Sequence, residues 1–569
     1  MDSAVFCNIC FILSLYFTHL LGFLEFSSKN GELFSMVMNK DRSNVFVGGH
    51  NILYNLTQDL QVSREYDACE LVNSSRDFCD SDVRVVKENN KIDYLMVCGT
   101  AAYGTCAALY RNGTYAPFMS SNNSTAKYVG SKTSVIAFFG HNFFGDYLLY
   151  VAMGYDGRPL NFYPYIISER RMRITNGKHE FLYYDKNESY TMKPEILNDS
   201  YFDFLYGFED HNHSYFISNQ NNSQEGIISQ SCKGTSIAKQ YIETKLTCGG
   251  SFYITDAFFL GSDPDPNLGT LYVAFYDHAT DTSKLCSYAQ EDIHEYLQRA
   301  VTNCDQHLKI PWMADSHLSC NQQNNANACR MDIIMRVDGQ LSATPVYLTA
   351  GRVTALAARV QARLGEVVFI GFDNGILKKI HLRSNRTLLI TDVAKNKTLG
   401  IRRGGLVIND KDQRLYVLCK TKVFLFPLDS CEVYNNCREC VGDLDECGWC
   451  LHRSAHRDTC TKSNECTSTS WYKRTCKPRI SDVSPKSGPT AGGTFVAITG
   501  EFVAENASRV TVEICNTTCD VNTSTTTTDK IQCSARERQR AEDCDLTVTL
   551  YDPIHSGYLL CDSANYTYK

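Results

Sequence analysis

The first 430 residues of the chain contain short apolar or alternating runs separated by turn residues, a pattern typical of β-strands. Residues 44–56 hold VFVGG and ILYNL around a Gly-Gly-His-Asn turn, and residues 367–380 hold two apolar runs around Asp373-Asn374-Gly375. Asn-Gly between two such runs is a strong hairpin signal. Seven hairpins of this kind begin near residues 45, 94, 148, 214, 271, 367 and 415.

Most of these hairpins lie about 50 to 65 residues apart, which is close to the length of one four-stranded blade. We therefore predict an all-β fold whose main part is a seven-bladed β-propeller, because radial closure protects the sheet edges. Leu33–Met38 (LFSMVM) is expected to complete the last blade. The pattern alone leaves an array of β-sandwiches open as the alternative.

The interval between the hairpins at 271 and 367 is about 40 residues too long for one blade. Within it, residues 291–301 read EDIHEYLQRAV, with apolar side chains at Ile293, Tyr296, Leu297 and Val301. That spacing is helical. We expect a helical insertion that protrudes from the fifth blade.

The last 139 residues differ in composition from the rest. Residues 431–476 hold eight cysteines, which indicates a small disulfide-stapled module. A Pro- and Gly-rich turn at 480–493 then precedes the alternating runs TFVAITG, TVEIC and LTVTLY, which suit an immunoglobulin-like β-sandwich. The expected order is a signal peptide at 1–22, a propeller at 23–430, the cysteine-rich module at 431–476 and the sandwich at 478–569.

Composition places the chain in the secretory pathway. Residues 5–26 are mostly apolar and read as a signal peptide cleaved near Gly22, with an uncleaved anchor as the alternative. The 26 cysteines and fifteen Asn-x-Ser/Thr sequons point to the same compartment. The formal net charge of −7 disfavours a nucleic-acid partner, and no interior apolar run is long enough to span a membrane.

Five motifs resemble the extracellular part of the plexin family. They are VFVGGHNILYNL at 45–56, LMVCGTAAYGTC at 95–106, GYDGRPLNFYP at 154–164, CGWC at 447–450 and VSPKSGPTAGGTFVAITG at 483–500. The resemblance implies a sema propeller, a PSI domain and an IPT domain. CGWC would also fit semaphorins, but the IPT segment that follows distinguishes plexins from them. The chain is expected to be either a receptor ectodomain fragment or a naturally soluble protein.

The eight cysteines of 431–476 permit many pairings, and a zinc site at the two CxxC pairs is the alternative to disulfides. The resemblance to plexins implies one particular set. Its nine disulfides are Cys69–Cys79, Cys98–Cys106, Cys232–Cys329, Cys248–Cys286, Cys304–Cys320, Cys431–Cys447, Cys437–Cys476, Cys440–Cys460 and Cys450–Cys466. Cys419 is then left over in the propeller, and alternation in LYVLC predicts a buried free thiol, with a long-range link to an IPT cysteine as the alternative.

The sequons are unevenly distributed along the propeller. The predicted glycosylation sites are Asn55, Asn73, Asn112, Asn122, Asn123, Asn187, Asn198, Asn212, Asn221, Asn385, Asn396, Asn506, Asn516, Asn522 and Asn565. None lies between Gln224 and Ser384. Because a glycan blocks close approach of another protein, this stretch is a candidate docking face. Its alternative explanation is that the helical insertion and its disulfides occupy it.

The sequence contains no HExxH, GxSxG, Gly-rich phosphate loop or dinucleotide fingerprint, so we do not predict an enzyme, a cofactor, a metal site or a small-molecule substrate. The resemblance implies an extracellular protein that recognises a semaphorin-type ligand through its propeller. A membrane association is expected only if the chain is part of a longer receptor. The alternative is a semaphorin-like secreted ligand or adhesion protein that forms homodimers through its own propeller.

Overall fold

A computed structural model describes residues 24–569 of the chain, with gaps. The segments left out within that range are 73–78, 90–92, 120–124, 143–144, 160–164, 176–177, 184–189, 191–200, 211, 221–224, 234–239, 262–267, 303–307, 314–332, 362–364, 384–385, 393–398, 429–430, 432–433, 435–436, 443–446, 452–458, 467–470, 474, 504–509 and 553–557. The chain forms two compact units, Met1–Leu428 and Asp429–Lys569. Among the described residues, no helix has the length and apolar character needed to cross a bilayer.

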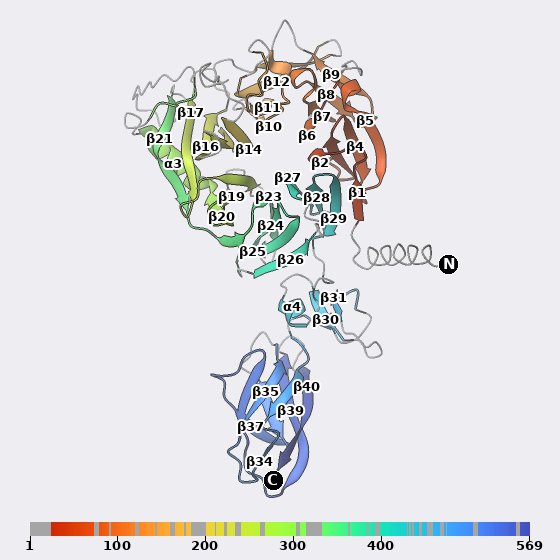
Figure 1. The fold of residues 1–569 in the computed structure, drawn as a ribbon, viewed down its shortest axis with the longest axis vertical. Coiled ribbons are helices and arrows are strands. Elements are labelled where there is room, and N and C mark those ends of the chain that lie inside the picture. The colour runs from red at the N-terminus through yellow and green to blue at the C-terminus, as the bar shows by residue number, and fades with distance from the viewer. Residues whose placement is uncertain are drawn as a thin grey trace, which may run out of the picture. The chain divides into compact units, whose positions relative to one another are not determined.

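The first unit is a seven-bladed β-propeller. Its sheets surround a common centre in Figure 1, and each blade is a four-stranded antiparallel sheet whose first strand is the innermost. The first three blades are β2 (Leu33–Met38), β3 (Asn44–Gly49), β4 (Ile52–Thr57) and β5 (Val62–Asp67); β6 (Val83–Asn89), β7 (Tyr94–Gly99), β8 (Cys106–Tyr110) and β9 (Tyr115–Met119); and β10 (Val135–His141), β11 (Tyr147–Met153), β12 (Ile167–Thr175) and β13 (Lys178–Tyr183).

The remaining blades follow the same order around the ring. They are β14 (Phe202–Glu209), β15 (His213–Gln220), β16 (Glu225–Cys232) and β17 (Gln240–Cys248); β18 (Ile254–Gly261), β19 (Gly269–Asp277), β20 (Thr282–Ala289) and β22 (Tyr347–Ala350); β23 (Val353–Gln361), β24 (Gly365–Phe372), β25 (Ile376–His381) and β26 (Arg386–Asp392); and β27 (Ile401–Asn409), β28 (Arg414–Cys419), β29 (Lys422–Pro427) and β1 (Leu24–Ser27). Short helical segments are α2 (Ala68–Leu71), η2 (Ala101–Tyr103) and η3 (Thr125–Lys127).

All seven predicted hairpins are confirmed to begin at the second strand of a blade, although the hairpin predicted from residue 148 was expected to end before β12 begins. Their periodicity was easy to read because these strands are buried on both faces; all six residues of β7 are buried, for example. The turn at 50–51 requires a left-handed residue, and Asn51 supplies it with φ of 60°. Apolar side chains of adjacent blades pack together, so the core of this unit lies between the blades.

The prediction for closing the ring was wrong in one respect. Leu33–Met38 does not complete the last blade; it pairs with β3 as the inner strand of the first blade. The last blade is completed by β1, which pairs antiparallel with β29 from Leu24↔Leu425 to Ser27↔Lys422. Both β1 and β2 precede the first hairpin in the sequence, and it is β1, the strand nearer the N-terminus, that joins the last blade.

The predicted helix is confirmed as α3 (Gln290–Thr302), between the third and fourth strands of the fifth blade. It does not protrude as expected, because Ile293 and Leu297 are fully buried in a cluster with residues of the fourth and fifth blades. The insertion also contains β21 (Ile333–Ala343), which pairs in parallel with β17. This extra strand covers the outer edge of the fourth blade.

The second unit begins with the small cysteine-rich module. It contains α4 (Cys437–Gly442) and a three-stranded sheet of β30 (Cys447–Cys450), β31 (Thr459–Lys462) and β32 (Trp471–Tyr472), in the order β31-β30-β32. Four disulfides hold it together. The side chain of Trp449 is partly buried against Cys437, Cys476 and Val441.

The rest of the second unit is an immunoglobulin-like β-sandwich. Its strands are β33 (Arg479–Ser484), β34 (Ser487–Gly488), β35 (Phe495–Glu501), β36 (Val510–Ile514), β37 (Thr517–Val521), β38 (Lys530–Ser534), β39 (Glu542–Asp552) and β40 (Tyr558–Tyr568). They follow the order β33-β35-β38-β37-β36-β39-β40-β34 around one apolar core. Cys515 and Asn516 both have positive φ at the two-residue turn between β36 and β37, as a tight hairpin requires.

Candidate binding surfaces

Most of the expected disulfide pairs are present in the structure. In the propeller the structure pairs Cys69 with Cys79, Cys98 with Cys106, and Cys248 with Cys286; in the cysteine-rich module it pairs Cys431 with Cys447, Cys437 with Cys476, Cys440 with Cys460, and Cys450 with Cys466. Cys232 is disulfide-bonded as well. Its expected partner Cys329, and both members of the expected pair Cys304–Cys320, lie outside the described residues.

Two consequences follow for the cysteine chemistry. The zinc alternative for the CxxC pairs is not supported, because all four of those sulfurs are bonded to other cysteines. The structure adds Cys515–Cys544 and Cys519–Cys533 in the sandwich. Cys419 is the one free cysteine among the described residues, and it is fully buried, as predicted.

The described sequons lie mostly at the surface. Exposed asparagines are Asn112, Asn212, Asn516, Asn522 and Asn565. Asn55 is half-buried in β4, where its Oδ1 accepts a hydrogen bond of 2.7 Å from Asn44 Nδ2. The other predicted sites lie outside the described residues: Asn73, Asn122, Asn123, Asn187, Asn198, Asn221, Asn385, Asn396 and Asn506. Glycosylation at all fifteen sites stays a prediction.

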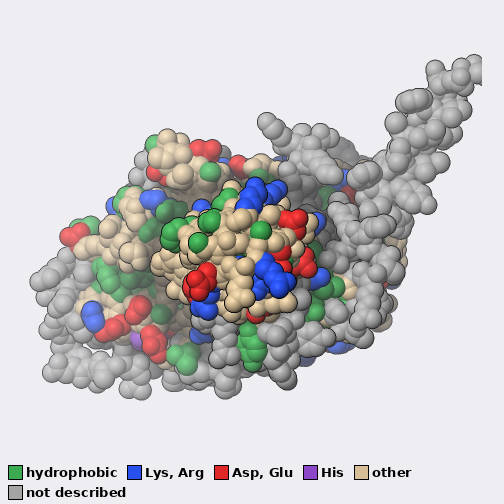
Figure 2. Space-filling model, turned by 90° about the horizontal axis from the view of Figure 1, so that it is seen from below, with side chains coloured by type: hydrophobic (Ala, Val, Ile, Leu, Met, Phe, Trp, Pro, Cys, Tyr) green, Lys and Arg blue, Asp and Glu red, His purple; other side chains and the backbone are tan. Residues whose placement is uncertain are grey.

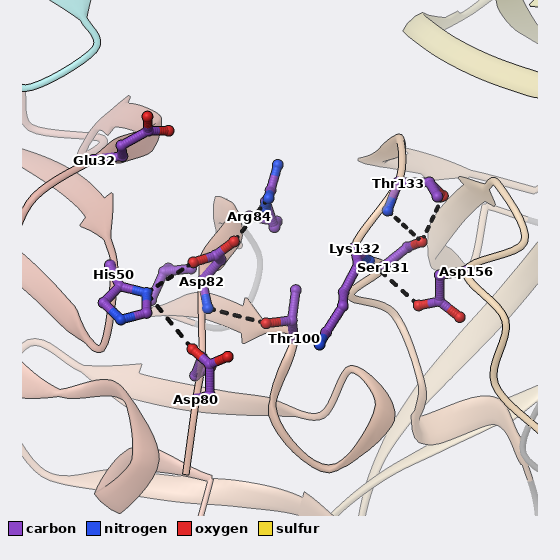
Figure 3. A network of polar contacts seen from close by, with 12 residues as sticks. Glu32, His50, Asp80, Asp82, Arg84, Thr100, Ser131, Lys132, Thr133 and Asp156 are labelled. Atoms are coloured by element: carbon purple, nitrogen blue, oxygen red, sulfur yellow. Dashed lines mark hydrogen bonds and ion pairs between the residues drawn. The ribbon is translucent and has the colours of Figure 1, made fainter. Parts of the chain in front are cut away.

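One candidate surface is a polar network where the first three blades meet, formed by turns between second and third strands and by crossovers between blades (Figure 3). His50 Nδ1 lies 3.1 Å from Asp82 Oδ1 and 3.7 Å from Asp80 Oδ1. Asp82 also accepts a hydrogen bond of 2.7 Å from Arg84, and its backbone N–H donates to the Thr100 hydroxyl. The carboxylate of Asp82 therefore joins the first and second blades.

A second group of polar contacts lies around Asp156 in the third blade (Figure 3). Its carboxylate accepts hydrogen bonds from the Lys132 backbone N–H at 3.3 Å and from Arg158 Nε at 2.7 Å. Burial raises the pKa of Asp156, but the hydrogen bonds and charge of Arg158 outweigh burial and hold that pKa below its usual range. Arg158 also donates a hydrogen bond to the backbone carbonyl of Tyr103 in the second blade, so these contacts link adjacent blades.

The second candidate surface is residues 341–350, which we call the rim segment. It includes the end of β21 and all of β22, and its sequence LSATPVYLTA has no charged residue. Side chains alternate along it, with the exposed positions Ser342, Thr344, Val346, Leu348 and Ala350. Leu348 is 61% exposed and Val346 is 38% exposed. Alternation at a sheet edge gives one outward-facing stripe of small and apolar groups.

The rim segment differs from other outer strands of the propeller. β5 contains Arg64 and Glu65, charged residues that protect a sheet edge from pairing with other chains, whereas β9 and β13 cover each other by pairing in parallel. β22 contains no charged residue, and the one proline of the rim segment, Pro345, precedes β22 by two residues. The sequence places residues 341–350 in the stretch without sequons, but it does not show that they form an exposed sheet edge. The signal that could have indicated this edge is their alternation without charged residues.

Exposed hydrophobic side chains favour the same region. Among the described residues, 224–384 supplies this set of large exposed hydrophobics: Phe252, Leu268, Leu308, Val346, Leu348 and Val360. Phe252, Leu268 and Leu308 lie outside the strands and Val360 lies near the end of β23, whereas Val346 and Leu348 lie together in the rim segment. On the face drawn in Figure 2, the coloured acidic and basic side chains are interspersed, and hydrophobic ones form small groups.

Comparisons with known proteins agree with this architecture. The IPT/TIG domain family matches residues 478–568. Human Plexin-A4 is 24% identical over 519 residues, which cover 78% of this chain and 27% of Plexin-A4. The chain thus spans about a quarter of the length of this relative.

Solved structures show the same fold. The Plexin A4 extracellular region, domains 1 to 8, matches with a TM-score of 0.67 and 18% identity over 96% of this chain and 67% of that one. Drosophila Semaphorin 2a matches with a TM-score of 0.54 and 18% identity over 96% and 97% of the two chains. Drosophila Plexin A, solved in complex with Semaphorin 1b, matches with a TM-score of 0.50 and 17% identity over 79% and 95%. In its propeller, disulfide-rich module and IPT domain, and in its sequence, the chain is similar to the extracellular region of plexins.

Proposed function

We propose that the chain recognises a semaphorin-type protein ligand through its propeller, as the binding part of a cell-surface receptor or as a soluble decoy. The functional division is a sema domain at 23–430, a PSI domain at 431–476 and an IPT domain at 478–569, after a signal peptide at 1–22. The observation that supports this most strongly is the similarity to plexins over 78% of the chain. A solved complex of a structural neighbour pairs Plexin A with Semaphorin 1b.

The rim segment is the surface that we assign to the ligand. A protein partner gains affinity from apolar groups that are already exposed and from a sheet edge whose backbone groups can pair. The rim segment offers both, and no sequon lies between Gln224 and Ser384. We therefore expect no glycan to be attached to this edge itself.

The experiment places a glycan on the rim segment. The double variant Leu348→Asn/Ala350→Thr creates a sequon whose two altered side chains are exposed. The matched control is Val62→Asn/Arg64→Thr, which puts a glycan on exposed positions of β5, the outer strand of the first blade. Gly269→Thr is unsuitable because a Cβ there would lie 2.3 Å from the ring of Phe259.

Both variants and the unaltered chain are secreted, checked for glycan occupancy and screened against secreted and membrane semaphorin ectodomains. We expect binding by the unaltered chain and the β5 control, and loss of at least about tenfold in affinity for the rim variant. Equal binding by the two variants would place the ligand on another surface. A folded chain that binds no semaphorin would contradict the proposed function itself.

Light scattering of the purified chain tests the alternative of a semaphorin-like ligand. A receptor-type chain is expected to be monomeric at micromolar concentration. A stable homodimer that the rim glycan dissociates would favour the ligand or adhesion reading, because the same edge would then serve a second copy of the chain.

A further inference from the structure

Three side chains of metal-binding type meet where helix α3 contacts the fourth blade. Asp210 lies in the turn between β14 and β15, His213 is the first residue of β15, and His294 lies in the first half of α3. One nitrogen or carboxylate oxygen from each lies within 4.8 Å of the others. Asp210 and His213 are 7% and 3% exposed, and His294 is half-buried. We propose that Asp210, His213 and His294 bind a zinc ion that fastens the insertion of the fifth blade to the fourth blade.

The carboxylate of Asp210 is held in a fixed position. Its Oδ1 accepts hydrogen bonds from the backbone N–H groups of Asn212 at 2.8 Å and His213 at 2.7 Å. Its Oδ2 accepts the hydroxyl of Tyr215 at 2.8 Å. Each carboxylate oxygen has two acceptor directions, so Oδ2 retains one for a cation. Outer partners of this kind orient metal ligands and increase their affinity.

The two imidazoles have a spacing that suits a shared ion. The ring centres of His213 and His294 lie 5.2 Å apart at an interplanar angle of 49°. With Zn–N bonds of about 2 Å in a tetrahedral site, two imidazole ring centres are expected about 5 Å apart. His213 Nδ1 also lies 3.4 Å from Asp210 Oδ1.

Helix α3 contributes two buried polar atoms near the cluster that lack hydrogen-bond partners among the described residues. His294 Nδ1 is buried and receives no hydrogen bond from the described residues. Gln290, one helical turn earlier and 2% exposed, has a buried Oε1 that is likewise without a donor among them. The nearby ammonium of Lys233 does not oppose a cation, because Glu209 pairs with it at 2.5 Å.

The donor set selects the kind of ion. Two imidazoles and one carboxylate suit zinc, whereas calcium and magnesium prefer oxygen ligands. The sequence did not reveal this set because the second histidine stands 81 residues before His294, in a different blade. A site that joins α3 to the fourth blade would act beside the Cys248–Cys286 disulfide, which joins β17 to β20.

The test uses the full secreted chain, purified without a polyhistidine tag, stripped with chelator and titrated calorimetrically with zinc chloride. We expect one strong zinc site per chain and no comparable heat with calcium chloride. His294→Gln should weaken zinc binding at least about 100-fold and Tyr215→Phe about tenfold, since loss of an outer partner alone costs 10- to 100-fold. The matched control is His278→Gln, which alters an exposed histidine on the fifth blade.

A second readout needs no variant: zinc should slow amide hydrogen exchange in α3 of the unaltered chain. Secretion and circular dichroism establish that the variants fold. The proposal is wrong if the stripped chain takes up no zinc at micromolar concentrations, if His294→Gln and His278→Gln bind zinc equally, or if zinc leaves the exchange of α3 unchanged.

Discussion

Arg403 and Asp203 form a two-point ion pair across the centre of the propeller. Arg403 belongs to β27, the inner strand of the seventh blade, and Asp203 to β14, the inner strand of the fourth. Nη1 lies 2.6 Å from Oδ1, and Nη2 lies 2.9 Å from Oδ2. Because the two blades are not neighbours in the ring, this pair constrains its diameter directly.

Replacing Arg403 by lysine should lower the free energy of unfolding of the propeller by about 1–2 kcal/mol. Lysine keeps the charge but loses the planar fork that makes two hydrogen bonds to the carboxylate. The expected loss is at the lower end for charged hydrogen bonds because 34% of the Arg403 side chain is exposed. Chemical denaturation measures it; Arg173→Lys, whose partner is Glu180, is the control with little expected effect. Equal losses in both variants would contradict a special role for Arg403.

Asp256 should make the propeller less stable as the pH rises from about 4 to about 7. Burial raises the pKa of Asp256 to about 7, against hydrogen bonds from backbone N–H groups and the charge of Arg403, which lower it. Between about pH 4 and pH 7 the unfolded state has released the proton that the folded state still holds. Each rise in pH within this window therefore favours the unfolded state and lowers the free energy of unfolding. The slope from this residue is at most about 1.4 kcal/mol per pH unit.

Asp256→Asn should flatten the stability profile between about pH 4 and pH 7, as measured by denaturation at several pH values. Asp80→Asn, at an exposed carboxylate, serves as the control and should leave the slope in place. A slope that survives Asp256→Asn would assign the pH dependence to other groups.

Trp449→Ala should destabilise the cysteine-rich module by about 2–3 kcal/mol. The ring packs against the Cys437–Cys476 disulfide and Val441 but stays partly exposed, so the cost falls below that of a fully buried tryptophan. Thermal melting and secreted yield measure the effect. Phe495→Ala, at a ring 77% exposed in the same unit, should change little. A Trp449 variant with unchanged melting would show that the disulfides alone determine the module.

Cys419 should resist alkylation until the propeller unfolds. Burial raises the pKa of its thiol to about 12, and the thiolate is the reactive form. Mass-spectrometric mapping with iodoacetamide should find Cys419 unmodified in the native chain and modified in denaturant. Cys419→Ser should cost about 1–3 kcal/mol more than Cys419→Ala, because a buried hydroxyl needs a partner that the thiol does not. Rapid native labelling would contradict this burial.

Local signals predicted the hairpins because each depends on residues close in sequence. Apolar alternation and turn residues such as Asn374-Gly375 mark a strand pair wherever it lies. The same signals indicate that Leu33–Met38 is a strand but do not determine which sheet it joins, since that choice depends on ring closure. The pairing of β21 with β17 likewise joins Gln240 to Ile333 across strands β18 to β20 and helix α3, and no local pattern indicates it.

The candidate binding surface and the proposed zinc site also depend partly on local sequence and partly on contacts between distant segments. The uncharged run at 341–350 is visible in the sequence, but its exposure follows from its position on the outermost strand of a blade. His213 and His294 come close together because α3 packs against the fourth blade. The apolar residues Ile293 and Leu297 show in the sequence that the helix has a buried face, but they do not show which blade covers it.

The pairing of β1 with β29 has a consequence for the timing of biosynthesis. Leu24 leaves the ribosome about 400 residues before its partner Leu425, a delay on the order of 20–80 s at usual elongation rates. During that interval the early blades can form their own sheets, but the ring stays open and β1 has no sheet to join. We therefore expect chaperones to hold this N-terminal strand until the last blade emerges, and a ribosome stalled before residue 422 to display an incomplete propeller to quality control.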